Sequence, residues 1–114
     1  MEALPLAVAA MMGNVDVSAQ VVLNLQGNFE RNVVQYQCEG LEPFSVDFIN
    51  AAPNFLAIVP IGPQKLVFVN VMSADGAKYA AGQFEFWTKG SEATLTDLQA
   101  DPQAVSCAEV NETP

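Results

Sequence analysis

Histidine is absent from this sequence, and cysteine is scarce, with only Cys38 and Cys107 present. A structural zinc site takes four ligands, mostly from these two residue types, so we expect no metal site. The absence of histidine also excludes the serine and cysteine nucleophile systems that need a histidine base. No catalytic residue and no cofactor are indicated, and the sequence therefore predicts a protein that is not an enzyme.

Basic residues are also few. Thirteen acidic side chains outweigh four basic ones, and the formal net charge is −9 at pH 7. A field of this sign repels phosphate backbones and anionic membrane surfaces, so we expect no nucleic-acid partner. The same field attracts a basic protein partner, although an acidic surface that only keeps a small protein soluble is an alternative. The basic residues are Arg31, Lys65, Lys78 and Lys89.

Long apolar runs are missing as well. No stretch reaches the ~18 consecutive apolar residues of a membrane-spanning helix, so we expect a soluble protein without membrane insertion. Residues 4–13 resemble the apolar region of a signal peptide and residues 17–19 resemble a cleavage site, but Glu2 stands where a basic residue is usual. Residues 1–19 are interpreted either as a leader remnant or as an N-terminal arm, with a short helix over residues 7–12 as an option.

The two cysteines are placed as in many exported proteins. One lies in an early strand-like run and the other lies near the C-terminus. An even pair of this kind is typical of a disulfide formed in an oxidising, extracytoplasmic compartment. Two reduced cysteines, acting as small buried hydrophobic residues in a cytosolic protein, are the alternative.

The chain from residue 20 onward has the pattern of an all-β protein. Short runs rich in β-branched and aromatic residues alternate with Gly, Pro, Asn and Asp at turns. About eight or nine strands favour a closed antiparallel β-barrel, because closure removes exposed strand edges. One domain is expected over residues 20–110, with a tail at 111–114. The predicted strands cover residues 20–26, 32–39, 44–50, 55–59, 65–72, 78–80, 83–88, 93–98 and 105–110.

Within several runs the apolar residues alternate, which predicts the side that faces the core. The residues expected on inward faces are Val34, Tyr36 and Cys38 in one run and Phe44, Val46 and Phe48 in the next. In a later run Phe84, Phe86 and Thr88 share one face, and Gln83, Glu85, Trp87 and Lys89 share the other. Turn signals at Asp75-Gly76 and Lys89-Gly90-Ser91 bracket this run, so Asp75 and Lys89 are expected to project from one rim.

The segment around these turns resembles the signature of the c-type lysozyme inhibitors of Gram-negative bacteria, known in membrane-anchored and periplasmic forms. That signature runs Ser-Gly-x-x-Tyr, then a variable stretch, then Phe-Trp-x-Lys-Gly-x-x-Ala. Its counterparts here are Gly76, Tyr79, Phe86, Trp87, Lys89, Gly90 and Ala93. The similarity extends to Tyr36-x-Cys38-x-Gly40 and to Cys107, and so covers residues from about 33 to 107.

The resemblance implies a periplasmic protein with an eight-stranded antiparallel barrel closed by a disulfide between Cys38 and Cys107. It also implies that the partner is a c-type lysozyme, whose active-site cleft is blocked by one loop of the barrel. In the family a serine before the glycine and the lysine of the Trp-x-Lys-Gly motif reach the catalytic groups of the enzyme. The candidate partner-binding residues are therefore Lys89, Ser73, Asp75, Gly76, Tyr79 and Gly90.

The sequence departs from the family at Asp75, which stands where the family has serine. Lysozyme holds one protonated and one ionised carboxyl group in its cleft. Lys89 would pair well with them, whereas the carboxylate of Asp75 would be repelled unless it accepts a hydrogen bond from the protonated acid. Two further arrangements stay open: Asp75 turns outward, or Ser73 supplies the missing hydroxyl. A carrier of small apolar ligands, a surface adhesin or assembly subunit, and a homodimer are the remaining alternatives.

Overall fold

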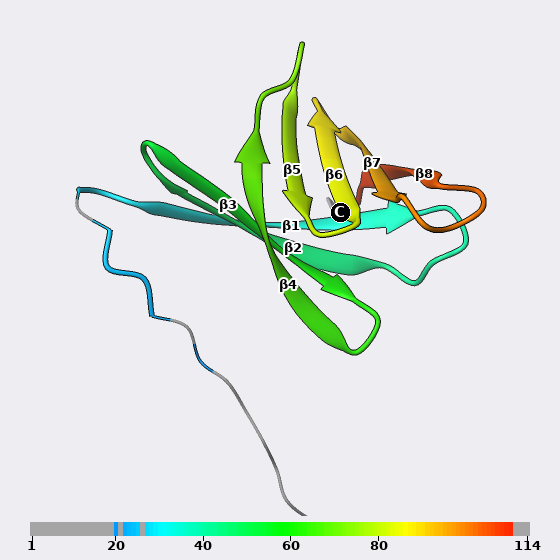
Figure 1. Cartoon of the computed structure of the whole chain (residues 1–114), viewed down its shortest axis with the longest axis horizontal. Coiled ribbons are helices and arrows are strands. Elements are labelled where there is room, and N and C mark those ends of the chain that lie inside the picture. Colours follow the sequence, from blue (N-terminus) through cyan, green and yellow to red (C-terminus); the bar gives the residue numbers. More distant parts are fainter. Residues whose placement is uncertain (1–19, 21, 26, 111–114) are drawn as a thin grey trace, which may run out of the picture.

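A computed structural model describes residue 20, residues 22–25 and residues 27–110 (Figure 1). The signal-like stretch and the short helix expected within residues 1–19 lie outside the described residues. In the described part of the chain, no helix is long and apolar enough to cross a membrane.

Eight strands form a closed antiparallel barrel in which each strand pairs with its neighbour in sequence and β1 pairs with β8. This confirms the predicted fold class, and every predicted run from residue 32 onward coincides with a strand to within two residues at its start and one or two at its end. The strands are β1 (Glu30–Cys38), β2 (Phe44–Ala51), β3 (Asn54–Ile61), β4 (Gln64–Val71), β5 (Ala77–Ala81), β6 (Phe84–Lys89), β7 (Glu92–Asp97) and β8 (Ala104–Glu109).

The strand predicted over residues 20–26 is wrong for the part of that run that the structure describes. Gln20 and residues 22–25 lie outside the strands, and their side chains are exposed. The barrel interior is already filled by side chains of the eight strands, so the apolar residues of this run have no core to pack into and gain nothing from strand pairing.

The barrel interior is filled by apolar side chains. Tyr36 and Phe86 pack edge to face, with ring centroids 5.1 Å apart. The inward faces predicted for the first two runs and for the Phe84 to Thr88 run are confirmed, since their apolar members lie in the core or pack against it. The largest side chains with almost no exposure are Tyr36, Phe68, Phe86, Val46 and Val59.

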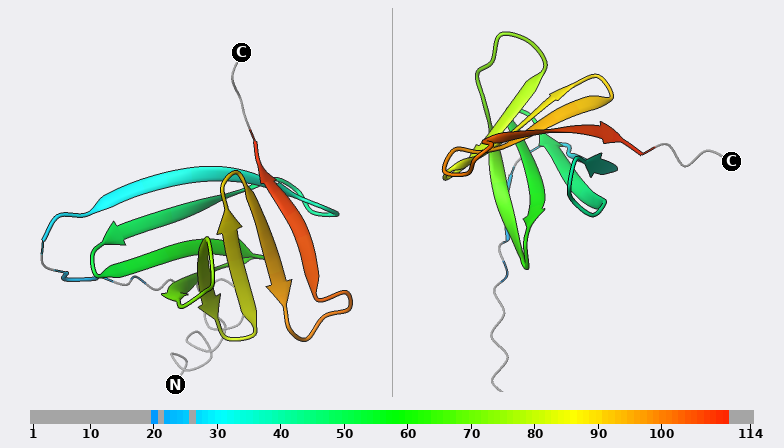
Figure 2. Two further views of the ribbon diagram at one scale, coloured as in Figure 1. Left: turned by 90° about the horizontal axis from the view of Figure 1, so that it is seen from above. Right: turned by 90° about the vertical axis from the view of Figure 1, so that its right-hand side faces the viewer.

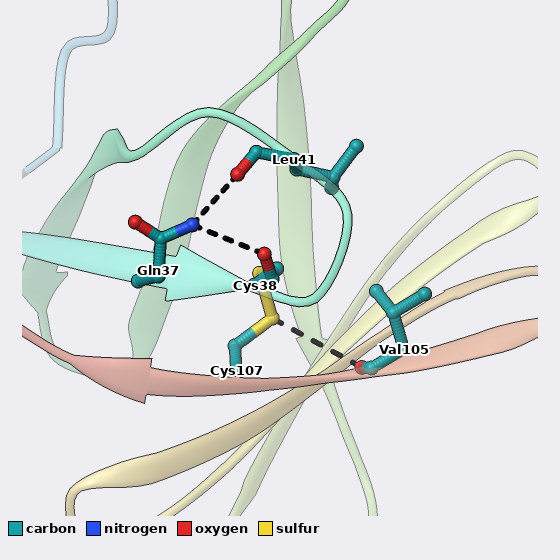
Figure 3. Close-up of a disulfide and its surroundings, with 5 residues drawn as sticks. All are labelled: Gln37, Cys38, Leu41, Val105 and Cys107. Atoms are coloured by element: carbon teal, nitrogen blue, oxygen red, sulfur yellow. Dashed lines mark hydrogen bonds between the residues drawn. A yellow bond between two sulfur atoms is a disulfide. The ribbon is translucent and has the colours of Figure 1, made fainter.

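A disulfide joins Cys38 to Cys107 across the seam where β1 meets β8 (Figure 3). The two residues lie directly opposite each other in a ladder of only three residue pairs. The side-chain amide of Gln37 donates hydrogen bonds to the carbonyls of Leu41 at 2.7 Å and Cys38 at 3.2 Å, which fixes the chain as it leaves β1. The disulfide is therefore confirmed, and the reduced alternative is wrong.

Antiparallel topology places successive connections at alternate ends of the barrel. The β2–β3, β4–β5 and β6–β7 connections lie at one end, which we call the Lys89 end. The other connections lie at the opposite end, which we call the Phe84 end. In Figure 1 the β4–β5 loop stands beside the arrowhead of β6, and Figure 2 shows β6, β7 and β8 side by side. Two segments that are separate in sequence, residues 72–76 and residues 89–91, thus share one end.

Candidate functional site

Lys89 is the last residue of β6 and carries a charged group at its end of the barrel. Its side chain is 52% exposed, and its Nζ lies 3.7 Å from Oδ1 of Asp75. The same Nζ lies 4.3 Å from the centroid of the Trp87 ring, within the range of a cation–π interaction. The ammonium group is therefore supported from two directions and still open to solvent.

The main chain of the β4–β5 loop is held against β6 by Trp87. The indole Nε1 of Trp87 donates a hydrogen bond to the carbonyl oxygen of Asp75 at 2.8 Å. The hydroxyl of Ser73 donates to the same carbonyl at 3.1 Å and lies 3.5 Å from the carbonyl of Gly76. These contacts tie the loop to the strand that ends in Lys89, so the two segments form one structural unit.

Gly76 lies where the loop passes closest to β6. Its φ is +65°, and a Cβ added there would lie 2.2 Å from the carbonyl oxygen of Thr88. A side chain at this position would both strain the backbone and push the loop away from the strand. Gly90 also has a positive φ, of +61°, but a Cβ there would meet nothing within 4 Å. Glycine is thus required at position 76 for contact and at position 90 for conformation.

The outer face of β5 and β6 continues this charged surface. Lys78 Nζ lies 4.8 Å from the centroid of the Trp87 ring and 3.5 Å from a carboxylate oxygen of Glu85. Trp87 therefore contacts two ammonium groups, one of them balanced by Glu85 and the other by Asp75. The sequence pattern had placed Glu85, Trp87 and Lys89 on one face, and the structure confirms that they share it.

Two phenols lie in the barrel at the Lys89 end. Burial raises the pKa of Tyr36 to about 12, with smaller contributions from Glu109 and Tyr79. Burial also raises the pKa of Tyr79. Tyr79 pairs with Phe86 across β5 and β6 and packs against Phe48 at a centroid distance of 5.6 Å. Its place is therefore in the core.

Five of the six residues singled out from the sequence lie in the β4–β5 loop and at the end of β6, whereas the Tyr79 side chain is buried and lines a hollow together with Thr88 and Gly90. Lys89 ends β6, Gly90 begins the turn that follows, and Ser73, Asp75 and Gly76 lie in the adjacent β4–β5 loop. The sequence analysis missed the supporting role of Trp87 and Lys78. The alternation that put Trp87 and Lys89 on one face was the available signal, because residues two apart in a strand lie side by side.

No metal centre is indicated in the described part of the chain, where no three His, Cys, Asp or Glu side chains are grouped as ligands. This surface presents the exposed ammonium of Lys89 on β6. Beside it lie the hydroxyl of Ser73 and the carboxylate of Asp75, on a loop that is hydrogen-bonded to Trp87. Such a surface can enter a concave site that contains acidic groups and exclude other molecules from it.

Comparison with known proteins identifies what the chain resembles. The family described as "Membrane-bound lysozyme-inhibitor of c-type lysozyme" matches residues 36–104. A protein of Pseudomonas aeruginosa named membrane-bound lysozyme inhibitor of C-type lysozyme is 46% identical over 99 residues, which cover 82% of this chain and 78% of that protein. A protein of the same name from Cupriavidus necator is 43% identical over 76 residues, covering 66% of this chain and 61% of its own length.

A solved structure also matches. The crystal structure of Pseudomonas aeruginosa MliC in complex with hen egg white lysozyme superposes with a TM-score of 0.70 at 45% sequence identity. The match covers 82% of this chain and the whole of that chain. Fold and sequence therefore point to the same group of proteins.

Proposed function

The chain belongs to the family of membrane-bound lysozyme inhibitors of c-type lysozyme, and on this premise we propose that it is an exported, periplasmic inhibitor of c-type lysozyme. It acts as a binding protein that occludes the active-site cleft of the enzyme. One observation carries this proposal for the site: Lys89 projects beside a loop that is fixed to the same strand.

The chemistry of the target fits this arrangement. Glycoside hydrolysis by lysozyme needs one carboxylic acid and one carboxylate on either side of the scissile bond. An ammonium placed between them pairs with the carboxylate and accepts no proton from the acid. Lys89 would thus neutralise the pair, while residues 72–76 fill the space that the sugar would occupy. Gly76 lets the loop lie close against β6, and Gly90 allows the positive φ of the turn that follows Lys89.

Net charge supports the encounter. The chain carries a formal charge of −9, and opposite charge on a basic enzyme accelerates association. Salt screens such attraction over ~10 Å at 0.1 M ionic strength. The association rate measured by stopped flow should therefore fall as salt rises.

The alternatives find less support. An eight-stranded barrel holds a ligand only if its inward side chains leave room, and here Phe68, Phe86 and Tyr36 fill the interior. No observation favours an adhesin or assembly subunit. The division into residues 1–19, 20–110 and 111–114, and a homodimer, stay predictions.

The direct test is a lysis assay in which the protein is titrated into hen egg white lysozyme acting on bacterial cell walls. We expect inhibition that saturates at a fixed ratio of protein to enzyme. A lysozyme of another type, with a differently shaped cleft, serves as the control. Undiminished lysis at a large molar excess of the protein would refute the proposed function.

A further inference from the structure

Within the described part of the chain, the carboxylate of Asp75 forms one ion pair, with the ammonium of Lys89. The pair is separated by 3.7 Å, and the two side chains are 67% and 52% exposed. No other ion pair of Asp75 occurs among the described residues. A pair this open to solvent is weak, so a competing carboxylate can exchange with it.

The fold of the loop does not depend on this carboxylate. The main-chain carbonyl of Asp75, and not its side chain, accepts the hydrogen bonds from Trp87 and Ser73. The close contact of Gly76 with Thr88 is also made by main-chain atoms. Replacing the carboxylate by a neutral side chain should therefore leave the loop in place.

Lys89 also keeps its position without Asp75. Its ammonium lies over the Trp87 ring, and Trp87 is anchored by its own hydrogen bond to the loop. The ring supplies part of the favourable electrostatic environment that an exposed carboxylate would otherwise provide. The side chain of Asp75 is thus not needed to position Lys89. Its carboxylate is nevertheless paired with the Lys89 ammonium and competes with any other carboxylate for it.

We propose that Asp75 is an internal competitor that holds the Lys89 ammonium in the free inhibitor and must release it when the target binds. This inference rests on the proposed function. In the complex the carboxylate of the enzyme takes the place of Asp75 beside Lys89. Asp75 then becomes an added negative charge next to an acidic site, which lowers affinity. The residue therefore limits the strength of inhibition and is a determinant of affinity, not a contact that the target needs.

The test is a double-mutant cycle on inhibition of hen egg white lysozyme, using Asp75→Asn in the wild-type and Lys89→Ala backgrounds. Asp75→Asn should lower the inhibition constant by about 2- to 5-fold, the range expected for loss of a competing exposed pair. In the Lys89→Ala background the same change should give a clearly smaller gain, because the competition for Lys89 is gone and only the direct repulsion between Asp75 and the enzyme remains. The gain should shrink at high salt.

Glu42→Gln is the matched control, since it removes one negative charge from the exposed β1–β2 loop at the opposite end of the barrel. It should leave the inhibition constant unchanged. An equal gain from Glu42→Gln would mean that only net charge matters. An equal gain from Asp75→Asn in both backgrounds would mean direct repulsion without competition, and a loss would mean that Asp75 positions Lys89. Each of these three results would overturn the proposal.

A second measurement needs no lysozyme. In the isolated protein, acetylation of Lys89 by a small amine-reactive reagent should be faster in Asp75→Asn than in wild type, because the carboxylate that is paired with one side of the amine is removed. Lys65, at the start of β4, is the internal reference. Equal rates would show that Asp75 does not hold Lys89 in solution. If instead the rates differ but wild type fails to inhibit, the pairing stands and the proposed function is the part that fails.

Discussion

Both ends of this barrel consist of connections between antiparallel strands, but they differ in the side chains that they expose. The Lys89 end presents a fixed loop with a hydroxyl, a carboxylate and an ammonium. The Phe84 end surrounds a largely apolar hollow of about 550 Å³ that has acidic residues at its edge and no basic ones. Its apolar lining includes Phe44, Ile61, Phe84, Leu95 and Val105.

This difference shows where recognition of an acidic cleft can reside. The apolar side chains of the Phe84 end pack against the core, so they mainly complete the interior of the barrel. Among the described residues, Lys89 and Arg31 are the two cations that are more than half exposed and paired with a carboxylate, and of these two only Lys89 also lies over an aromatic ring. This difference favours the Lys89 end as the proposed partner-binding end.

The largest expected effect comes from removing the charge at the Lys89 end. If Lys89 meets two carboxyl groups in a desolvated cleft, Lys89→Ala should cost about 2 to 5 kcal/mol, or about 30-fold to several-thousand-fold in affinity. The melting temperature should stay unchanged, because the side chain is largely exposed. Lys65→Ala, at the other end, is the matched control and should inhibit like wild type. Equal inhibition by both variants would break the assignment of the two ends.

The disulfide is the next largest contribution, and it stabilises both ends alike. It encloses a separation of 69 residues, for which loop-closure entropy gives a stabilisation of about 4 kcal/mol as an upper figure. The double variant Cys38→Ala/Cys107→Ala should lose much of this stabilisation, measured as the free energy of unfolding in urea. The molecules that remain folded should still inhibit lysozyme. Unchanged stability would show that the three-pair seam between β1 and β8 closes the barrel unaided.

Gly76→Ala should disturb the Lys89 end through the contact with Thr88. Gly62→Ala, in the β3–β4 turn, is the matched control, because its φ of +59° is similar but its Cβ would meet nothing within 4 Å. Both variants should lose about 1 kcal/mol or more to backbone strain. Only Gly76→Ala should also weaken inhibition, as measured by titration against lysozyme. Equal inhibition by the two variants would mean that the close approach of the loop is not needed.

The effect with the least influence on the comparison of the two ends appears at high pH. The pKa of Tyr36 is about 12 in the folded protein and near 10 when unfolded, so between these values only the unfolded state loses the proton. The stability should therefore be complete below pH 10 and decline as pH rises toward 12, by up to about 2 kcal/mol. Tyr36→Phe should flatten this decline in urea titrations at pH 9 and pH 11. A decline of the same size in Tyr36→Phe would assign it to other groups.

Much of the fold could be predicted because the strands alternate regularly. Tyr36, Val46 and Phe86 each occupy an apolar position of period two, and each is buried. The wrong strand over residues 20–26 shows the limit of this approach. Its residues have strand propensity, but whether a strand forms depends on a surface for its side chains to pack against, and the eight strands already fill the core.

The residues of the candidate site were proposed from the sequence and stay a prediction, whereas their mutual contacts come from the structure. The motif indicated Gly76 and Lys89, and the turn signals placed Asp75 and Lys89 at one rim. The hydrogen bond from Trp87 to the loop depends on the register of β5 against β6, in which Ala77 lies opposite Thr88. A register of this kind is fixed by packing of the whole barrel, so sequence spacing alone does not reveal it.

The central claim is that the Lys89 end, and not the Phe84 end, enters the lysozyme cleft. Amide hydrogen exchange of the protein with and without saturating hen egg white lysozyme tests it most directly. The account predicts slower exchange in residues 72–76 and 89–92 on binding, with little change in residues 61–64 and 98–103. Protection confined to residues 61–64 and 98–103 would contradict it.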